Sequence, residues 1–258
     1  MTSPDNLMNL SEHNHCGQIQ AAWRSGLNSE IAYWRNWVET KGGRFPKDYA
    51  ARMSADTELQ PQIVHYLPEG QQMVAILDVG SGPLTILGHK LPEVVLNITA
   101  VDALADEYNK ILDQHGIVPI VRTQICATEE LSSKFGCDKF DVAYARNTLD
   151  HSIDPLRAVA EMLSVVRKGG IVLTEHARNE GETQKYVGLH QWNFDIQNGD
   201  FVIKGRDTPP TNLLTSLDGK ARVLEITPVG PFVRFAVQKL IEGAVAIENL
   251  TRFRNDHL

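Results

Sequence analysis

The chain has 258 residues, which fits one large domain or one domain with an added subdomain. Its 25 Lys and Arg against 32 Asp and Glu give a formal charge of −7, which argues against a protein that neutralises nucleic-acid phosphates. Three cysteines without a CxxC spacing predict neither a disulfide framework nor structural zinc. No signal peptide pattern and no long apolar stretch stand out, so we expect a cytoplasmic protein that acts on a small molecule, away from membranes.

Residues 1–70 are predicted to form a helical N-terminal extension. In the segment 29–40, Ile31, Trp34 and Val38 recur on one helical face, and the pattern ends at two glycines. A second, shorter helix is predicted over residues 47–53. We expect this extension to cover the active-site end of the following domain or to form a homodimer surface, with ordinary packing as the alternative.

From residue 71 onward, apolar runs alternate with helical segments. Buried strands are predicted over residues 73–80, 98–102, 117–128, 139–146 and 170–176, and helices over 84–90, 103–114 and 155–167. The last helix is well delimited, with Asp154 as N-cap and Pro155 at its first position. This alternation predicts an α/β fold with a Rossmann-like, doubly wound and mostly parallel sheet, which binds ligands at the carboxyl ends of its strands.

The alternation stops after residue 176. A polar segment with embedded aromatics, residues 177–205, is too long for an ordinary connection and is predicted to be an insertion or a functional segment. Two further strands, over 221–228 and 233–240, are expected to form an antiparallel C-terminal hairpin that brings the sheet to seven strands. Residues 241–254 have a helical pattern. We therefore predict one domain over residues 71–258 that contains the insertion.

The segment ILDVGSGPLT contains the most specific local pattern, a buried strand followed by a glycine turn. Such glycines let backbone amides approach a ligand closely, although Thr85 replaces the third glycine of a dinucleotide fingerprint. Asp102 ends the next strand, where a carboxylate can accept both ribose hydroxyls or can simply cap the following helix. Small residues at 126–128 would allow an adenine ring to lie flat. Together these features favour a nucleoside-containing ligand.

In this order, the segments LDVGSGP, AVD, CATEEL, FDVAYARNTLDH and KGGIVLTEH resemble the class I S-adenosylmethionine-dependent methyltransferases. The resemblance covers roughly residues 65–240, and the predicted hairpin matches the family's reversed seventh strand. It implies S-adenosyl-L-methionine as the cofactor. The cofactor contacts that it implies come from Asp78, Gly80, Ser81, Gly82, Asp102, Ala103, Ala127, Thr128, Arg146 and Asn147.

Methyl transfer to a hydroxyl requires that the acceptor lose its proton, a task that suits a histidine near neutral pH. His151, next to Asp150 and just past the fourth strand, is our first candidate for the base, and a polar loop residue is its alternative interpretation. His176, at the end of the fifth strand, is a second catalytic candidate that is otherwise a hydrogen-bonded core histidine.

Three residues of the insertion are candidates for substrate contact. His190 and Trp192 lie in an aromatic patch that resembles the apolar wall of a ligand pocket, and Asn179 follows the fifth strand. A cover that packs on the sheet for stability alone explains the same pattern. A metal site is also conceivable, but no HxxxH or similar spacing supports it, so we predict no metal. The residues that such a site would use are Asp150, His176, Glu180 and His190.

A looser likeness to bacterial methyltransferases of glycan and small-molecule pathways covers about fifty residues from RNTLDHSIDP to LHQWNF. It suggests a hydroxyl of a polar small molecule, such as a sugar, as the acceptor. Residues 146–149 lack the N/D-P-P-Y/F motif with which methyltransferases of DNA and RNA bases hold a flipped base. The paired-glutamate loop that protein arginine methylation would require after the fourth strand is also missing. Two alternatives stay open, namely an NAD-dependent oxidoreductase and a non-catalytic, cofactor-binding regulatory protein.

Overall fold

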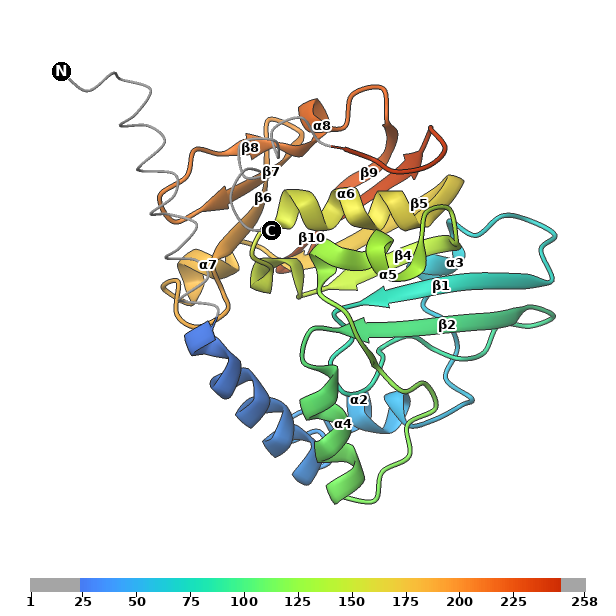
Figure 1. The fold of residues 1–258 in the computed structure, drawn as a ribbon, viewed down its shortest axis with the longest axis vertical. Helices are drawn as coiled ribbons and strands as arrows, with labels where there is room; N and C mark the ends of the chain where they lie inside the picture. Colours follow the sequence, from blue (N-terminus) through green and yellow to red (C-terminus); the bar gives the residue numbers. More distant parts are fainter. Residues whose placement is uncertain (1–23, 247–258) are drawn as a thin grey trace.

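A seven-stranded sheet forms the centre of the computed structural model, which describes residues 24–246 (Figure 1). Its strands follow the order β3-β2-β1-β4-β5-β10-β9, in which β10 is antiparallel to both of its neighbours and the other pairs are parallel. The strands are β1 (Met73–Val79), β2 (Val95–Asp102), β3 (Gln124–Ile125), β4 (Phe140–Arg146), β5 (Val166–Ala177), β9 (Ala221–Val229) and β10 (Phe232–Lys239). The predicted mostly parallel, doubly wound sheet with a C-terminal hairpin is confirmed.

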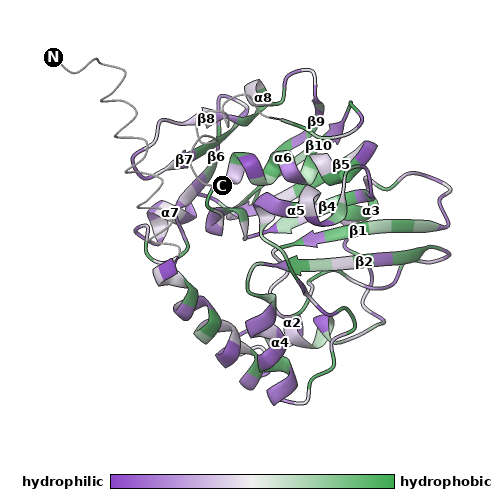
Figure 2. Cartoon of the chain, in the orientation of Figure 1, coloured by the Kyte–Doolittle hydropathy of each residue, from purple (hydrophilic) through white to green (hydrophobic). Residues whose placement is uncertain are grey.

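The central strands are apolar on both faces because both faces of the sheet are covered. In β4, Val142 and Tyr144 pack into one core, together with Ile63 of the short helix α3 (Pro61–Val64). The alternate residues Ala143 and Ala145 pack into another core, with α6 (Pro155–Val165). The short helix α5 (Leu131–Phe135) adjoins α6. Figure 2 shows the largely hydrophobic central strands between helices of mixed character.

The N-terminal segment packs beside α4 (Ala105–Gln114) rather than against the middle of the sheet (Figure 1). A helix over residues 24–39 buries Trp37 and Val38 against Tyr108, Ile111 and Leu112 of α4. A short α2 (Pro46–Arg52) follows. The helices predicted at 29–40 and 47–53 are therefore present. None of the helices within residues 24–246 is long and apolar enough to cross a membrane.

The predicted insertion, residues 177–205, builds a small antiparallel sheet together with the residues that follow it up to Ser216, in the order β6-β7-β8. Its elements are α7 (Glu180–Thr183), β6 (Trp192–Gln197), β7 (Asp200–Gly205), β8 (Thr211–Asn212) and α8 (Leu213–Ser216). Phe194 and Phe201 are fully buried and continue the core of the main sheet through Phe235 of β10. The proposed division into an extension and a domain with an insertion remains a prediction.

Two predictions for the chain between β1 and β4 were wrong. Residues 84–90 form bends and irregular chain instead of a helix, because Thr85 donates to the Asp78 carboxylate at 2.5 Å and accepts from the Leu87 amide. Gly88 then lies against the backbone of Glu58, where no Cβ would fit. The strand predicted over 117–128 shrinks to two paired residues, and Val118 is 80% exposed.

The chain after β10 is also not the predicted helix. Over residues 241–246 the chain forms bends, and residues 247–254 of that prediction lie outside the described residues. Gly243 uses its amide to donate to Asp138 and its carbonyl to accept from the buried Lys239 ammonium. These tertiary hydrogen bonds replace the ones that a helix would have made.

Candidate active site

A cavity of about 660 Å³ opens at the carboxyl ends of β1, β2 and β4. Its walls come from the loops after these strands, from the N-terminal helix and α2, and from the insertion. All ten residues predicted to contact the cofactor line it, namely Asp78, Gly80, Ser81, Gly82, Asp102, Ala103, Ala127, Thr128, Arg146 and Asn147. The topology therefore brings them to one place, while their individual roles remain predictions.

The glycine loop after β1 needs glycine for two reasons. Gly80 and Gly82 have φ values of +69° and +64°, a region that other residues rarely adopt. A Cβ at Gly80 would overlap the side chain of Thr148, and one at Gly82 would lie 2.9 Å from the Trp34 ring. The loop is fixed to β2, because the amides of Gly80 and Ser81 both donate to the Val101 carbonyl, at 2.8 and 3.0 Å.

Asp102 caps the backbone that follows β2 and also lines the cavity, so both roles considered for it, helix cap and ribose acceptor, are open to it. One carboxylate oxygen accepts the Gly82 amide at 3.0 Å and the other accepts the Leu104 amide at 2.9 Å, so the residue organises both loops. Burial raises its pKa to about 6 in spite of these hydrogen bonds. Asp102 lines the cavity, and each carboxylate oxygen can accept a further hydrogen bond, which is what the two hydroxyls of a ribose would require.

Asp78 is a buried carboxylate, 2% exposed, on the wall of the same cavity. Burial raises its pKa to about 6, although a hydrogen bond from Thr85 and the charge of Arg52 oppose the shift. A desolvated carboxylate of this kind is suited to pair with a ligand cation. The aminocarboxypropyl end of S-adenosylmethionine carries an ammonium group. The Asp78 carboxylate and the side-chain-free backbone at Gly80 and Gly82 therefore suit this cofactor.

An aromatic wall of the cavity lies directly against the glycine loop at Gly82. Trp34 and Trp37 of the N-terminal helix meet edge to face, with ring centroids 5.3 Å apart, and Trp34 also meets Tyr108 of α4. The Arg52 guanidinium lies over both indole rings, at 5.8 and 5.4 Å from their centroids. Sequence patterns identified the tryptophans only as a possible cover, and they gave no signal for Tyr108 or Arg52.

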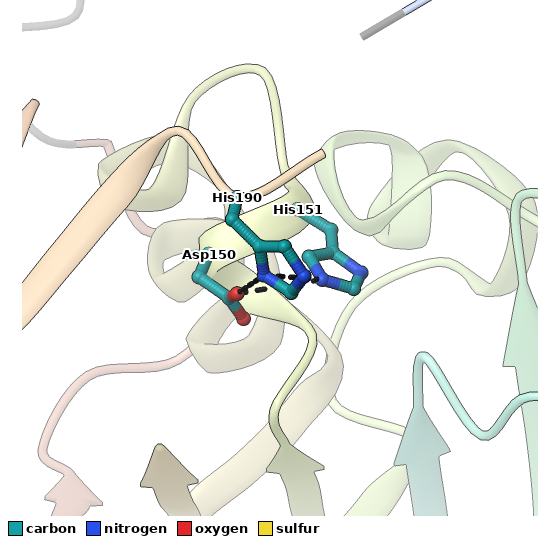
Figure 3. Close-up of side chains that lie close together, drawn as sticks. All are labelled: Asp150, His151 and His190. Carbon is teal, nitrogen blue, oxygen red and sulfur yellow. Dashed lines mark hydrogen bonds and ion pairs between the residues drawn. The ribbon is translucent and has the colours of Figure 1, made fainter. Parts of the chain in front are cut away.

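Asp150, His151 and His190 form a group at the other side of the cavity, which we call the His–Asp cluster (Figure 3). Asp150 and His151 lie in the 3₁₀ turn after β4, and His190 reaches them from the insertion. His190 Nδ1 lies 2.8 Å from Asp150 Oδ2 and 3.1 Å from His151 Nε2. Burial would raise the pKa of Asp150, but the charge of His151 and the hydrogen bond with His190 outweigh it and lower the pKa to about 2.

His176, our second candidate for a base, lies outside the cavity lining. Its ring is 1% exposed and stacks on Phe194 at a centroid distance of 4.6 Å, because β5 continues through residue 177 and holds the side chain in the core. Neither of its ring nitrogens has a hydrogen-bond partner among the described residues, and burial lowers its pKa to about 4. This position gives it no direct access to a substrate in the cavity.

Of the three insertion residues predicted to contact the substrate, only His190 lines the cavity. Trp192 and Asn179 do not line it, whereas Glu180, Leu189 and His190 do. The Trp192 indole donates to the Ser152 carbonyl at 2.9 Å, so it fastens the insertion to the turn after β4 instead of facing a ligand. Asn179 has a left-handed backbone, at φ 54°, at the start of α7. Sequence spacing could not tell these neighbours apart.

Comparison with known proteins gives one family match. Residues 77–174 match a family model described as a methyltransferase domain. No curated protein matches the chain significantly.

Several solved structures show a weak likeness. A candidate S-adenosylmethionine-dependent methyltransferase from Listeria monocytogenes shares 13% identity over 70% of this chain and 97% of its own, with a TM-score of 0.48. A geranyl diphosphate C-methyltransferase from Streptomyces coelicolor shares 13% identity over 69% of this chain and 78% of its own, with a TM-score of 0.46. An rRNA methylase from Streptococcus thermophilus shares 14% identity over 69% of this chain and 92% of its own, with a TM-score of 0.39. At these values we draw nothing from the superpositions about substrate or chemistry.

Three observations bear on the family of the chain. The family model spans β1 to β5, the sheet carries the expected antiparallel strand beside β5, and the glycine loop and Asp102 border one cavity. The alternative of an NAD-dependent oxidoreductase is thereby set aside. Residues 77–174 match a methyltransferase-domain model and the sheet has the Rossmann-like methyltransferase fold, which is consistent with the class I S-adenosylmethionine-dependent family and with S-adenosylmethionine as the cofactor.

Proposed function

We propose that this methyltransferase acts on a hydroxyl group of a polar small molecule, such as a sugar or a glycan precursor. The observation that carries the proposal is the position of the His–Asp cluster, which lines the same cavity as the glycine loop and Asp102. An alcohol is a poor nucleophile until it loses its proton, so polar groups at this position have a clear use. Carbon acceptors that are already activated would not require them.

The lining of the cavity supports a polar acceptor of modest size. Arg146 and Glu180 add one charge of each sign to the acceptor side, and Phe232 supplies an apolar face, against which Arg146 packs at 5.2 Å. A few charged groups on an aromatic background are typical of small-molecule sites. The acidic chain as a whole favours such an acceptor over a nucleic acid.

The bound cofactor supplies an electrophilic methyl group on a positively charged sulfur. The protein's own contribution is to align the acceptor oxygen with that methyl group, to exclude water, and to dispose of the hydroxyl proton. We assign the first two tasks to the aromatic wall and the insertion. The third we assign to the His–Asp cluster, with His151 and His190 as the side chains that reach the cavity.

The test is methyl transfer from isotopically labelled S-adenosylmethionine to a panel of sugars, nucleotide sugars and other polyols, with amines and activated carbon acids for comparison. We expect transfer to a hydroxyl, and we expect His151→Ala to lower turnover about 100-fold while S-adenosylhomocysteine affinity stays within about twofold. Transfer only to nitrogen or carbon would overturn the proposal. Cofactor binding without transfer to any acceptor class would favour the regulatory alternative.

A further inference from the structure

The three polar side chains of the His–Asp cluster converge on one point rather than forming a chain. His190 Nδ1, Asp150 Oδ2 and His151 Nε2 make a triangle with sides of 2.8, 3.1 and 3.4 Å (Figure 3). In a proton relay, the middle histidine would bind its two neighbours through opposite ring nitrogens. Here both neighbours meet the same nitrogen, Nδ1, which has only one hydrogen or one lone pair to offer. The arrangement is therefore a poor relay.

The size of the triangle fits a bound cation. Imidazole nitrogens and carboxylate oxygens bind first-row divalent metals at about 2.0–2.2 Å. Three such donors are about 3.0 Å apart on one face of an octahedron and about 3.4 Å apart in a tetrahedron, by the geometry of those bond lengths. The three sides fall at or near these values. Two histidines and one carboxylate on a single face are also a known ligand set for divalent metals with open positions.

A second observation concerns the other carboxylate oxygen of Asp150. Asp150 is only 3% exposed, and its Oδ1 is buried without a hydrogen-bond partner among the described residues. A buried, unpartnered oxygen on a charged group is costly. A cation bound at Oδ2 would neutralise the carboxylate, and a bidentate arrangement would also use Oδ1. The histidines, by contrast, are 19% and 30% exposed and line the cavity, which leaves room for further ligands.

The cluster is held in place by the surrounding backbone. The Gln191 amide donates to the Asp150 carbonyl at 3.1 Å, so the residue after His190 is fixed to the turn that carries Asp150 and His151. The Gln191 side chain in turn donates to the carbonyls of Tyr186 and Gly188. Supporting hydrogen bonds of this kind orient metal ligands in proteins. The three donors are thus positioned before any ligand arrives.

We propose that Asp150, His151 and His190 bind a divalent first-row transition-metal ion whose open positions face the cavity. The binding itself stands on this geometry alone, whereas its use in catalysis rests on the proposed hydroxyl acceptor. The acceptor oxygen binds the ion, which lowers the pKa of the hydroxyl, and its proton leaves to solvent. That oxygen forms a bond to the methyl carbon, the carbon–sulfur bond breaks, and its electron pair returns to sulfur.

The test uses the full chain, stripped with a chelator, and titrates it with Co²⁺ while the visible absorption of the ion is followed. We expect one equivalent to bind, and we expect His151→Ala and His190→Ala each to weaken binding at least 100-fold. Because His13, His15 and Cys16 are further possible ligands in the sequence, the titrations are repeated in a His13→Ala/His15→Ala background.

His115→Ala is the matched control. His115 also faces a carboxylate, that of Glu39 at 3.7 Å, but it lies outside the cavity lining and has no third metal-binding side chain beside it within residues 24–246, so its loss should leave Co²⁺ binding unchanged. Circular dichroism verifies that each variant is folded. No Co²⁺ binding by the wild type, or binding by His151→Ala and His190→Ala as tight as that of the wild type, would overturn the proposal. Metal binding without transfer to any hydroxyl would instead refute the proposed acceptor and leave the metal site intact.

Discussion

The two sides of the cavity differ in how the sequence specifies them. The side that we propose for the cofactor, called the cofactor side below, is made by short segments at the ends of adjacent strands, with Asp78, Gly80 and Asp102 each at or just after the end of a strand. The acceptor side combines a turn after β4 with His190, about forty residues further along the chain. The first is specified locally, and the second depends on how the insertion folds back.

This difference predicts that changes on the cofactor side reduce cofactor binding, whereas changes on the acceptor side reduce turnover. The largest effect should come from Gly80→Ala, because the added Cβ would overlap Thr148 and the residue would be strained at φ +69°. We expect S-adenosylhomocysteine affinity to fall more than 100-fold in a calorimetric titration.

Gly116→Ala is the control for backbone strain. Gly116 has a similar φ of +64° but no atom within 4 Å of the added Cβ. It should bind the cofactor normally and lose only about 1 kcal/mol of folding free energy. If both variants bound the cofactor equally well, the close approach at Gly80 would have no role in binding.

Asp78→Asn should separate stability from binding. The pKa of Asp78 is about 6 in the folded protein against 3.8 in the unfolded chain, so the folded state holds the proton more tightly. The stability from this protonation is present below pH 3.8 and is lost as the pH rises to about 6. Above that pH the ionised group costs roughly 3 kcal/mol, an order-of-magnitude figure.

The Asn variant should therefore be more stable than the wild type at pH 7.5, by about 1–3 kcal/mol in urea unfolding, and its advantage should shrink toward pH 4.5. Its S-adenosylhomocysteine affinity should fall about tenfold, since the cofactor ammonium loses a charged partner. A variant that is less stable than the wild type at pH 7.5 would show that the carboxylate is not held at a cost.

Trp34→Ala should have the smallest effect on the cofactor side. Trp34 lies over Gly82, meets Trp37 and Tyr108 edge to face and carries no charge of its own, so it supplies apolar cover. We expect cofactor affinity to fall about five- to tenfold, consistent with partial loss of apolar burial. Trp34→Phe should recover most of it. An affinity unchanged by Trp34→Ala would mean that the N-terminal helix does not cover the cofactor.

The sequence was most informative where the structure depends on local pattern. The buried runs, the glycine turn and the Asp154 cap predicted the sheet and the cofactor side, and Asp154 does accept the Arg157 amide at 3.0 Å. It failed where tertiary hydrogen bonds decide the conformation, as at Thr85 and Gly243.

The acceptor side shows the same limit. His176, His190 and His151 all follow strands or lie near them in the sequence, yet one is buried against Phe194 and two meet Asp150. Their separation depends on where β5 ends and on the fold of the insertion, and neither can be read from residue spacing. The sequence did not predict the proposed metal site for the same reason, since Asp150, His151 and His190 have no regular spacing.

The most direct test of the difference between the two sides compares Asp102→Ala with His190→Ala in one assay. S-adenosylhomocysteine affinity is measured by calorimetry, and labelled methyl transfer is measured with an acceptor that the wild type uses. We expect Asp102→Ala to weaken cofactor binding about 100-fold, since it removes the acceptor for the Gly82 and Leu104 amides, and His190→Ala to keep that affinity but lose transfer. Equal loss of cofactor affinity in the two variants would contradict the account.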